Sequence, residues 1–316
     1  MSLPLVIVNP ESAAGATGEA WPGIASDLGS NFGAFKVAFT SKAGQGIDLA
    51  SEAARKGVKL IIACGGDGTI SEVANGILES GTAAELGILP SGTGGDFRRT
   101  IEVPTRPRDA AQILRQGQTR LIDVGRVTYM NSSGVEDTRY FVGVASFGMS
   151  AAVIERVKDS GLEWFPAKAS KWLSGRVAFG TSMLQTALQS AATQVVVRLD
   201  DEHERHLTVA NFCVANGRYF GGGMKIAPDA KLTDGRFDVV SIGDLGTRKI
   251  LTNAPRIYFG SHLSMDQVHH ALARKVLARP VAKDEKIAIE IDGELLGHLP
   301  ATFQILPAAL RVRCPG

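Results

Sequence analysis

A short apolar run, Val58-Lys59-Leu60-Ile61-Ile62-Ala63, leads directly into Cys64-Gly65-Gly66-Asp67-Gly68-Thr69. An apolar run of this length, bounded by turn residues, is typical of a buried parallel strand. The apolar residues that follow recur at helical spacing: Ile70, Val73, Ala74, Ile77 and Leu78. The segment therefore predicts a strand, a glycine turn and a helix in succession, which is the unit from which α/β domains are built.

The same alternation of strand and helix extends to both sides of this segment. Strands are predicted at Leu5–Val8, Phe35–Phe39 and Leu86–Leu89, and helices at Lys42–Lys56 and Asp109–Arg115. Strands that alternate with helices along a chain favour a parallel sheet covered by helices. We therefore expect residues 1–125 to form a Rossmann-like, three-layer α/β domain with a parallel sheet.

After about residue 125 the pattern changes to short strand-like runs with few helical patterns between them. These runs are Arg139–Val144, Gln194–Leu199, Leu207–Ala215, Arg236–Ile242, Lys286–Ile291 and Thr302–Leu306. Their spacing favours a mainly antiparallel β-sandwich, and predicts a second domain over residues 126–306. Two helical stretches within Ser150–Ser190 are expected as insertions, and the tail 307–316 could return to complete the first domain.

The composition is that of a globular protein. The chain has 316 residues, of which 44% are apolar and 21% charged, with a net charge of +2. This balance excludes a disordered chain, a collagen and a coiled coil, and so small a net charge does not indicate a nucleic-acid partner. No run reaches the roughly 18 apolar residues of a membrane span, and no signal peptide is visible. Three widely spaced cysteines, Cys64, Cys213 and Cys314, fit a reducing cytoplasm.

Two glycine-rich turns, Gly65–Thr69 and Pro90–Asp96, follow neighbouring predicted strands. Ligands of open α/β sheets bind outside the carboxyl ends of the strands, and a helix that begins there offers N–H groups and a positive dipole end to phosphate. Neither turn matches the P-loop or the G-x-G-x-x-G dinucleotide pattern, and the protein-kinase motifs are absent. The alternative is that these are ordinary turns and that Thr69-x-x-Glu72 is a capping box.

Five groups of residues, spread over nearly the whole chain, form a recognisable series. They are Asn9-Pro10-Glu11-Ser12-Ala13-Ala14-Gly15, the Gly65–Thr69 turn, Pro90–Phe97, the block of Gly221–Met224, Ala227–Ala230 and Asp234-Gly235, and finally Ile291–Glu294 with Leu306–Leu310. The series resembles the signatures of bacterial diacylglycerol kinase-like lipid kinases, members of the diacylglycerol, sphingosine and NAD kinase superfamily. One position departs from the pattern: Gly95 stands where the family has Asn, so the amide side chain is missing from that turn.

The resemblance implies a kinase that transfers the γ-phosphoryl of ATP to the hydroxyl of diacylglycerol or a related lipid alcohol. It implies that ATP lies on the two glycine turns, Mg²⁺ at Asp67, and further nucleotide contacts at the ends of the first two strands. The nucleotide-binding residues implied are Asn9, Thr40, Gly65, Gly66, Asp67, Gly68, Thr69, Gly92 and Thr93. Glu72 is either a further nucleotide contact or a helix cap.

The base that deprotonates the lipid hydroxyl is expected from the second domain. Asp292 and Glu294 stand at i and i+2 after a predicted strand, and face the same side if the strand continues. Two carboxylates on one side raise each other's pKa and can share proton transfer. Either of them is a candidate, and the alternative is a charged hairpin turn, since Asp-Gly is a turn dipeptide. The resemblance also implies a second Mg²⁺ site at Lys231, Asp234 and Arg236, with Asp234 as its single carboxylate.

The expected partner is a lipid at a membrane surface. Trp164, Phe165 and Trp172 are interleaved with Lys158, Lys168, Lys171 and Arg176, which suits either a membrane interface or ordinary helix packing. We therefore expect a cytoplasmic protein that associates peripherally with the membrane. The alternatives are an NAD kinase and, because of Gly95, a nucleotide-binding regulator without catalysis. A dinucleotide-dependent oxidoreductase is disfavoured by the missing fingerprint.

Overall fold

A computed structural model describes residues 2–92, 95–152, 192–244 and 246–316. The first part of the chain alternates strand and helix, as its apolar pattern predicts. Its elements are β1 (Leu5–Val8), α1 (Ala16–Asn31), β2 (Lys36–Phe39), α2 (Gln45–Arg55), β3 (Leu60–Gly65), α3 (Asp67–Ser80), β4 (Glu85–Pro90), α4 (Asp96–Thr100) and α5 (Pro107–Gln116).

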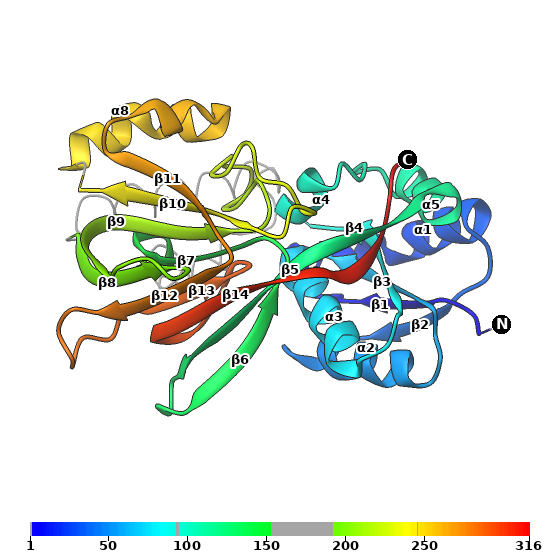
Figure 1. The fold of residues 1–316 in the computed structure, drawn as a ribbon. Helices are drawn as coiled ribbons and strands as arrows, with labels where there is room; N and C mark the ends of the chain where they lie inside the picture. The colour runs from blue at the N-terminus through cyan, green and yellow to red at the C-terminus, as the bar shows by residue number, and fades with distance from the viewer. Residues whose placement is uncertain (1, 93–94, 153–191, 245) are drawn as a thin grey trace.

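The first four strands pair in the order β2-β1-β3-β4, and each of these pairs is parallel. Every residue of β3 is buried, which explains why its sequence is a continuous apolar run rather than an alternating one. In Figure 1, α1 and α5 lie together above these strands and α2 and α3 lie together below them. All four strands therefore end, at their carboxyl ends, on the edge of the sheet where the glycine turns lie.

The second part of the chain is rich in antiparallel strands. Its elements are β5 (Gln118–Asn131), β6 (Glu136–Phe141), β7 (Val144–Gly148), β8 (Thr193–Leu199), β9 (Arg205–Ala215), β10 (Phe237–Gly243), α8 (Gly246–Phe259), the 3₁₀ turn η2 (Ser261–Ser264), β11 (Val268–Ala273), β12 (Lys275–Pro280), β13 (Ala288–Ile291) and β14 (Glu294–Cys314). The strands β7, β13, β14, β12, β8 and β9 pair in a closed circuit in which every pair is antiparallel. Aliphatic and aromatic side chains form a buried cluster on these strands, and Phe147 stacks on Phe212 with ring centroids 4.8 Å apart.

The strand β14 joins the two parts of the molecule (Figure 1). Its first half pairs with β13 and β12, whereas Arg311 and Val312 near its end pair with β4 in parallel. β5 runs beside β14 for most of its length and crosses residue 125 without a break. All fourteen strands of the described residues consequently belong to one sheet, which fixes the glycine turns relative to the β13–β14 hairpin.

One predicted strand is wrong. The run Arg139–Val144 is divided between β6 and β7, because the N–H groups of Val142 and Gly143 donate to the side chain of Asp292 instead of to a neighbouring strand. Helix α1 was not predicted. It contains Pro22, and its apolar period is weak because it buries only three residues. The helices expected over Ser150–Ser190, with their aromatic and basic residues, fall almost wholly within 153–191, outside the described residues.

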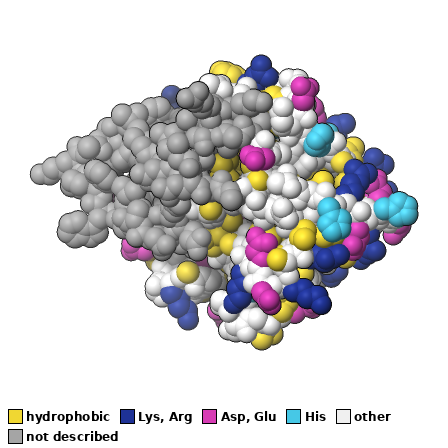
Figure 2. All heavy atoms as spheres, turned by 90° about the vertical axis from the view of Figure 1, so that its left-hand side faces the viewer, with side chains coloured by type: hydrophobic (Ala, Val, Ile, Leu, Met, Phe, Trp, Pro, Cys, Tyr) yellow, Lys and Arg dark blue, Asp and Glu magenta, His cyan; other side chains and the backbone are white. Residues whose placement is uncertain are grey.

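The surface carries charges of both signs. Figure 2 shows the face of the second part that lies away from β1–β4, where Lys and Arg side chains are interspersed with Asp and Glu over the described residues. Within the ranges that the structure describes, no helix combines the length and the apolar character needed to cross a membrane.

The close packing of α2 against α3 generates a prediction about Gly76. A Cβ atom at Gly76 would lie 2.7 Å from Ala50 Cβ and would also collide with the carbonyl oxygen of Ile47. Because backbone blocks it, we expect Gly76→Ala to destabilise the fold by about 1–3 kcal/mol in urea unfolding, as overpacking does. The control is Gly29→Ala on α1, where nothing lies within 4 Å, and which should stabilise by about 0.5–1 kcal/mol. A neutral Gly76→Ala would contradict the packing described here.

Candidate functional site

The loops that follow β1, β3 and β4 gather at one edge of the sheet. The Gly66 N–H donates to Ser12 Oγ at 2.9 Å, and the Ser91 N–H donates to the Gly65 carbonyl at 3.0 Å. Gly92 packs so closely that a Cβ on it would lie 2.9 Å from Gly66 Cα. Three segments distant in sequence thus converge on the start of α3.

The start of α3 has backbone N–H groups that lie outside the hydrogen bonds of the helix itself. The first hydrogen bond of the helix runs from Ile70 N–H to the Gly66 carbonyl, so the N–H groups of Asp67, Gly68 and Thr69 precede it. The partial positive charge of a helix N-terminus is concentrated at such groups. Thr69 Oγ1 is buried against Gly65 and has no hydrogen-bond partner among the described residues.

The carboxylate of Asp67 is bound by the backbone of the next loop. Its Oδ2 accepts the Gly95 N–H at 2.6 Å and the Asp96 N–H at 3.1 Å, while its Oδ1 accepts the Phe97 N–H at 3.2 Å. All three donors belong to the start of α4. Asp67 therefore fixes the second glycine turn against the first.

Asp96 connects this region to the second part of the chain. Its Oδ2 accepts the Gly222 N–H at 2.8 Å, and its Oδ1 accepts from Arg99 at 2.8 Å. Burial, and then the charge of Asp67, raises the pKa of Asp96 to about 6. The three glycines Gly221–Gly223 all have positive φ, which glycine adopts without strain and which brings the backbone within reach of Asp96.

Asp292 and Gly293 form the two-residue turn between β13 and β14. Both have positive φ, 48° and 89°, and Ile291 pairs directly with Glu294. The hairpin turn that Asp-Gly indicates as the alternative is thus confirmed for the backbone, and the condition under which Asp292 and Glu294 would face the same side, a strand that continues through Asp292, is not met. Because of the turn, Asp292 and Glu294 have separate surroundings.

The side chain of Asp292 is bonded to the segment between β6 and β7. It accepts the N–H groups of Val142, Gly143 and Val144 at 3.0, 2.9 and 3.2 Å. Burial raises the pKa of Asp292 to about 6, although these donors favour the ionised form and oppose the shift. Asp292 consequently anchors the hairpin to the rest of the sheet.

Glu294, in contrast, lies against the glycine turn. A Cβ on Gly68 would be 3.2 Å from Glu294 Oε1, and Arg139 lies 3.6 Å from the other carboxylate oxygen, Oε2. The side chain of Glu294 is about one-third exposed, at 35%. A carboxylate from the second part of the chain therefore meets the first turn of α3 at Gly68, where a side chain would crowd it.

The two parts of the chain match two family descriptions. Residues 4–127 match "Diacylglycerol kinase catalytic domain" and residues 143–314 match "YegS C-terminal NAD kinase beta sandwich-like domain". The chain is 32% identical over 270 residues to a diacylglycerol kinase of Mycobacterium tuberculosis, which covers 84% of this chain and 80% of that relative. The chain belongs to the diacylglycerol kinase family. The resemblance inferred from its five motifs is confirmed.

Other members of the diacylglycerol kinase family extend this likeness. The chain is 30% identical over 277 residues to a diacylglycerol kinase of Bacillus subtilis, covering 87% of this chain and 84% of that one. The crystal structure of a diacylglycerol kinase from Bacillus anthracis has the same fold, with a TM-score of 0.70 and 22% identity over 99% of this chain and 96% of that chain.

Not every residue expected in the nucleotide site lies free to contact a ligand. Both carboxylate oxygens of Glu72 accept N–H groups, from Gly44 and Gly46 at 2.8 Å each, so Glu72 caps α2. The alternative that Thr69 and Glu72 form a capping box is wrong, because Thr69 lies inside α3 and Glu72 caps a different helix. Thr40 is buried and its N–H donates to the Val8 carbonyl at 2.9 Å.

Asn9 and Thr93 are two further residues expected to contact the nucleotide. Asn9 lies at the end of β1, where its Oδ1 accepts the Glu11 N–H at 3.1 Å and so shapes the loop that carries Ser12. Thr93 lies outside the described residues.

The three residues expected to hold a second Mg²⁺ lie in an exposed turn. Asp234 Oδ1 accepts the Arg236 N–H at 3.1 Å, and Lys231 is exposed as well. Within the described ranges, no group of three or more His, Cys, Asp and Glu side chains is arranged to hold a metal ion. The second metal site stays a prediction.

Three residues that the sequence analysis did not place in the site prove to organise it. Ser12 and Asp96 stand within the quoted motifs, so their motifs were the available signal. Asp123 on β5 had no such signal: it is buried, and it accepts the N–H groups of Gly235 at 2.7 Å and Ala308 at 2.8 Å. It thereby links β5, the Asp234-Gly235 turn and β14.

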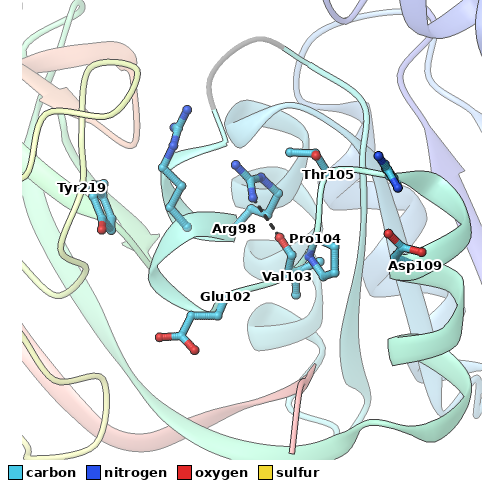
Figure 3. A pocket seen from close by; sticks show the side chains of 9 residues that line it. Arg98, Glu102, Val103, Pro104, Thr105, Asp109 and Tyr219 are labelled. Carbon is cyan, nitrogen blue, oxygen red and sulfur yellow. Dashed lines mark hydrogen bonds between the residues drawn. The ribbon is translucent and has the colours of Figure 1, made fainter.

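A pocket of about 500 Å³ opens beside α4 (Figure 3). Arg98, Arg99 and Arg106 line it, together with Tyr219 from the second part of the chain. Arg98 is held in place, because its Nη1 donates to the Val103 carbonyl at 2.8 Å. Since Arg99 also forms an ion pair with Asp96, the pocket lies next to the carboxylate of Asp96.

The departure at Gly95 generates a prediction. The Gly95 N–H donates to Asp67, and the backbone of Gly95 has a φ of 72°. Neither feature requires an amide side chain at this position. We expect Gly95→Ala to cost about 1–2 kcal/mol in urea unfolding, since left-handed backbone disfavours a Cβ. Gly95→Asn should cost less, because Asn tolerates this conformation. The same or a larger loss with Asn than with Ala would contradict this explanation.

Proposed function

We propose that this chain is an ATP-dependent lipid kinase that phosphorylates the hydroxyl of diacylglycerol or a related lipid alcohol. The observation that carries the proposal is the position of Glu294, a carboxylate of the second part of the chain, against Gly68 at the start of α3. Phosphoryl transfer needs a phosphate-binding site and a group that orients the nucleophile, and here the two adjoin. The names of the relatives support the choice of a lipid acceptor.

The phosphates of ATP would lie on the N-terminus of α3, in a Rossmann-like first domain. Support comes from the N–H groups of Asp67, Gly68 and Thr69, from the unpartnered Thr69 hydroxyl and from the glycines that let a ligand approach the backbone. Gly92 would lie beside the phosphates from the second turn.

Asp67 is the residue that would hold Mg²⁺. The charge of Asp67 contributes to raising the pKa of Asp96 and Asp292, but the carboxylate of Asp67 accepts three backbone N–H groups and the described residues contain no group of three or more His, Cys, Asp and Glu side chains arranged to hold a metal ion. The proposal of Mg²⁺ at Asp67 therefore rests on the resemblance of its motif to that of the family. When bound, Mg²⁺ neutralises charge on the phosphates.

Glu294 is the better candidate for the base. Asp292 is partly buried and its oxygens already accept three N–H groups, so it holds the turn. Glu294 is partly exposed and directed at the phosphate-binding helix end. In the proposed reaction it accepts the lipid hydroxyl proton while that oxygen bonds to the γ-phosphorus, and the bond to the β–γ bridging oxygen breaks to release ADP.

The lipid substrate makes peripheral association with a membrane part of the proposal. The direct test is a phosphorylation assay with γ-labelled ATP and Mg²⁺ in mixed micelles, offering diacylglycerol, monoacylglycerol, sphingosine and ceramide, with NAD as a soluble acceptor. We expect label in a lipid product. Label in NAD would replace the proposal with an NAD kinase, and ATP binding without transfer to any acceptor would favour a regulator.

Substitution of the base gives the sharper prediction. We expect Glu294→Gln to lower kcat by a factor of about 10²–10⁴, the usual contribution of a general base, with KM for ATP and the thermal midpoint nearly unchanged. Asp292→Asn should instead lower the thermal midpoint, because one amide NH₂ would face backbone N–H donors. The control is Glu136→Gln on β6, an exposed carboxylate. Full activity in Glu294→Gln would eliminate Glu294 as the base.

A further inference from the structure

Glu290, on β13, is a buried carboxyl group that the proposed mechanism does not use. Its residue is 3% exposed, and it lies across from Ser146 of β7 in the strand register. It stands two residues before the Asp292-Gly293 turn. A charged carboxylate is costly at such a site unless it is paired with a cation or fully hydrogen-bonded.

Glu290 begins a chain of polar side chains that runs through the second part of the molecule. One carboxyl oxygen, Oε1, accepts the Gly293 N–H at 2.6 Å, and the other, Oε2, contacts Ser146 Oγ. Ser146 Oγ lies 2.7 Å from Ser150 Oγ. Ser150 Oγ in turn lies 2.8 Å from Asn211 Oδ1, which also accepts the Ser150 N–H at 3.0 Å.

The number of protons available to these hydrogen bonds determines whether Glu290 is protonated. There are three oxygen–oxygen contacts, Glu290 to Ser146, Ser146 to Ser150 and Ser150 to Asn211 Oδ1, and each needs one proton. The end at Asn211 must be the amide oxygen, because it accepts a backbone N–H. The two serine hydroxyls supply only two protons, since a carboxylate and an amide oxygen have none to give. The third proton is available only if Glu290 is itself protonated.

We propose that Glu290 is a neutral carboxylic acid on the acid side of neutrality and that, through the Gly293 N–H, it is the positioning residue that holds the Asp292-Gly293 turn and thus directs Glu294 at α3. In this state the Glu290 Oε2–H donates to Ser146, Ser146 donates to Ser150, and Ser150 donates to Asn211. The carbonyl oxygen of the acid accepts from Gly293. The positioning role rests on the proposed lipid kinase function, whereas the protonation does not.

The acidic groups that face Glu290 oppose its ionisation, whereas its hydrogen bonds with Ser146 and the Gly293 N–H favour the ionised form. Asp292 in the turn and Asp96 from α4 are negative when ionised, and Cys213 on β9 is a buried thiol whose own pKa is raised by burial and by Glu290. Burial, with these charges, raises the pKa of Glu290 to about 7. Above that pH, ionisation of Glu290 leaves one of the three oxygen–oxygen contacts without a proton. It also adds a negative charge beside Asp292.

The sign of the pH dependence follows. The pKa of Glu290 is higher in the folded protein than the ordinary value of 4.5, so the neutral acid contributes stability below pH 4.5 that is lost as the pH rises to about 7. The alignment of the Asp292-Gly293 turn, which directs Glu294 at α3, is likewise lost above pH 7. Since each pH unit above the pKa lowers the protonated fraction about tenfold, the wild type should lose kcat progressively on the alkaline side.

Glu290→Gln is the deciding variant, because glutamine reproduces the neutral acid: Nε2–H donates to Ser146 and Oε1 accepts from Gly293. We expect it to fold, to retain kcat at pH 6.5 within about twofold, and to lose the alkaline decline between pH 7 and 9. Its thermal midpoint, relative to that of the wild type, should rise from pH 5 to pH 7 and then level off. Glu285→Gln, at an exposed position before β13, should change neither profile.

A measurement on the folded chain without any substrate keeps the protonation testable by itself. The infrared difference spectrum of wild type minus Glu290→Gln at pH 6.5 should contain a carboxylic-acid carbonyl band that disappears by pH 9. A carboxylate band in its place at pH 6.5, with parallel thermal midpoints across the pH range, would overturn the protonation. An alkaline decline of kcat that persists in Glu290→Gln would overturn the positioning role. Failure of the kinase assay alone would count against the proposed function and not against the neutral acid.

Discussion

Backbone N–H groups that bind the carboxylates of Asp67 and Asp292 hold the site together. Asp67 accepts three of them from the start of α4, and Asp292 accepts three from the segment between β6 and β7. Hydrogen bonds to a charged acceptor are stronger than neutral ones and fix both partners in direction. Each carboxylate therefore positions a whole loop, and together they bring the glycine turn and the β13–β14 hairpin face to face.

The continuous sheet determines where these loops can lie. β14 begins at the hairpin, passes through the antiparallel circuit and ends in parallel pairing with β4. The distance between Gly68 and Glu294 is thus set by strand register, and the family relationship extends over both parts of the chain. This is the arrangement that a transfer reaction requires, because a donor site on one part and an acceptor group on the other must stay aligned through the reaction.

The strands and turns of the first part were predictable because their signals are local. β3 shows a buried apolar run, and the glycines after it mark the close approach of backbone seen at Gly92. The roles of Asp292 and Asp123 were not predictable, since their hydrogen-bond partners lie more than 100 residues away in the chain. For the same reason the strand break at Val142 and the use of Glu72 to cap α2 rather than α3 depend on tertiary contacts that no periodicity encodes.

The central claim is that α3 and Glu294 form a single phosphoryl-transfer site. The most direct test is a crystal structure of the chain soaked with Mg²⁺ and a non-hydrolysable ATP analogue. The account predicts the γ-phosphate at the first turn of α3, within hydrogen-bonding distance of the Gly68 or Thr69 N–H and on the side that Glu294 faces. Phosphates bound elsewhere, with Glu294 directed away from them, would contradict it.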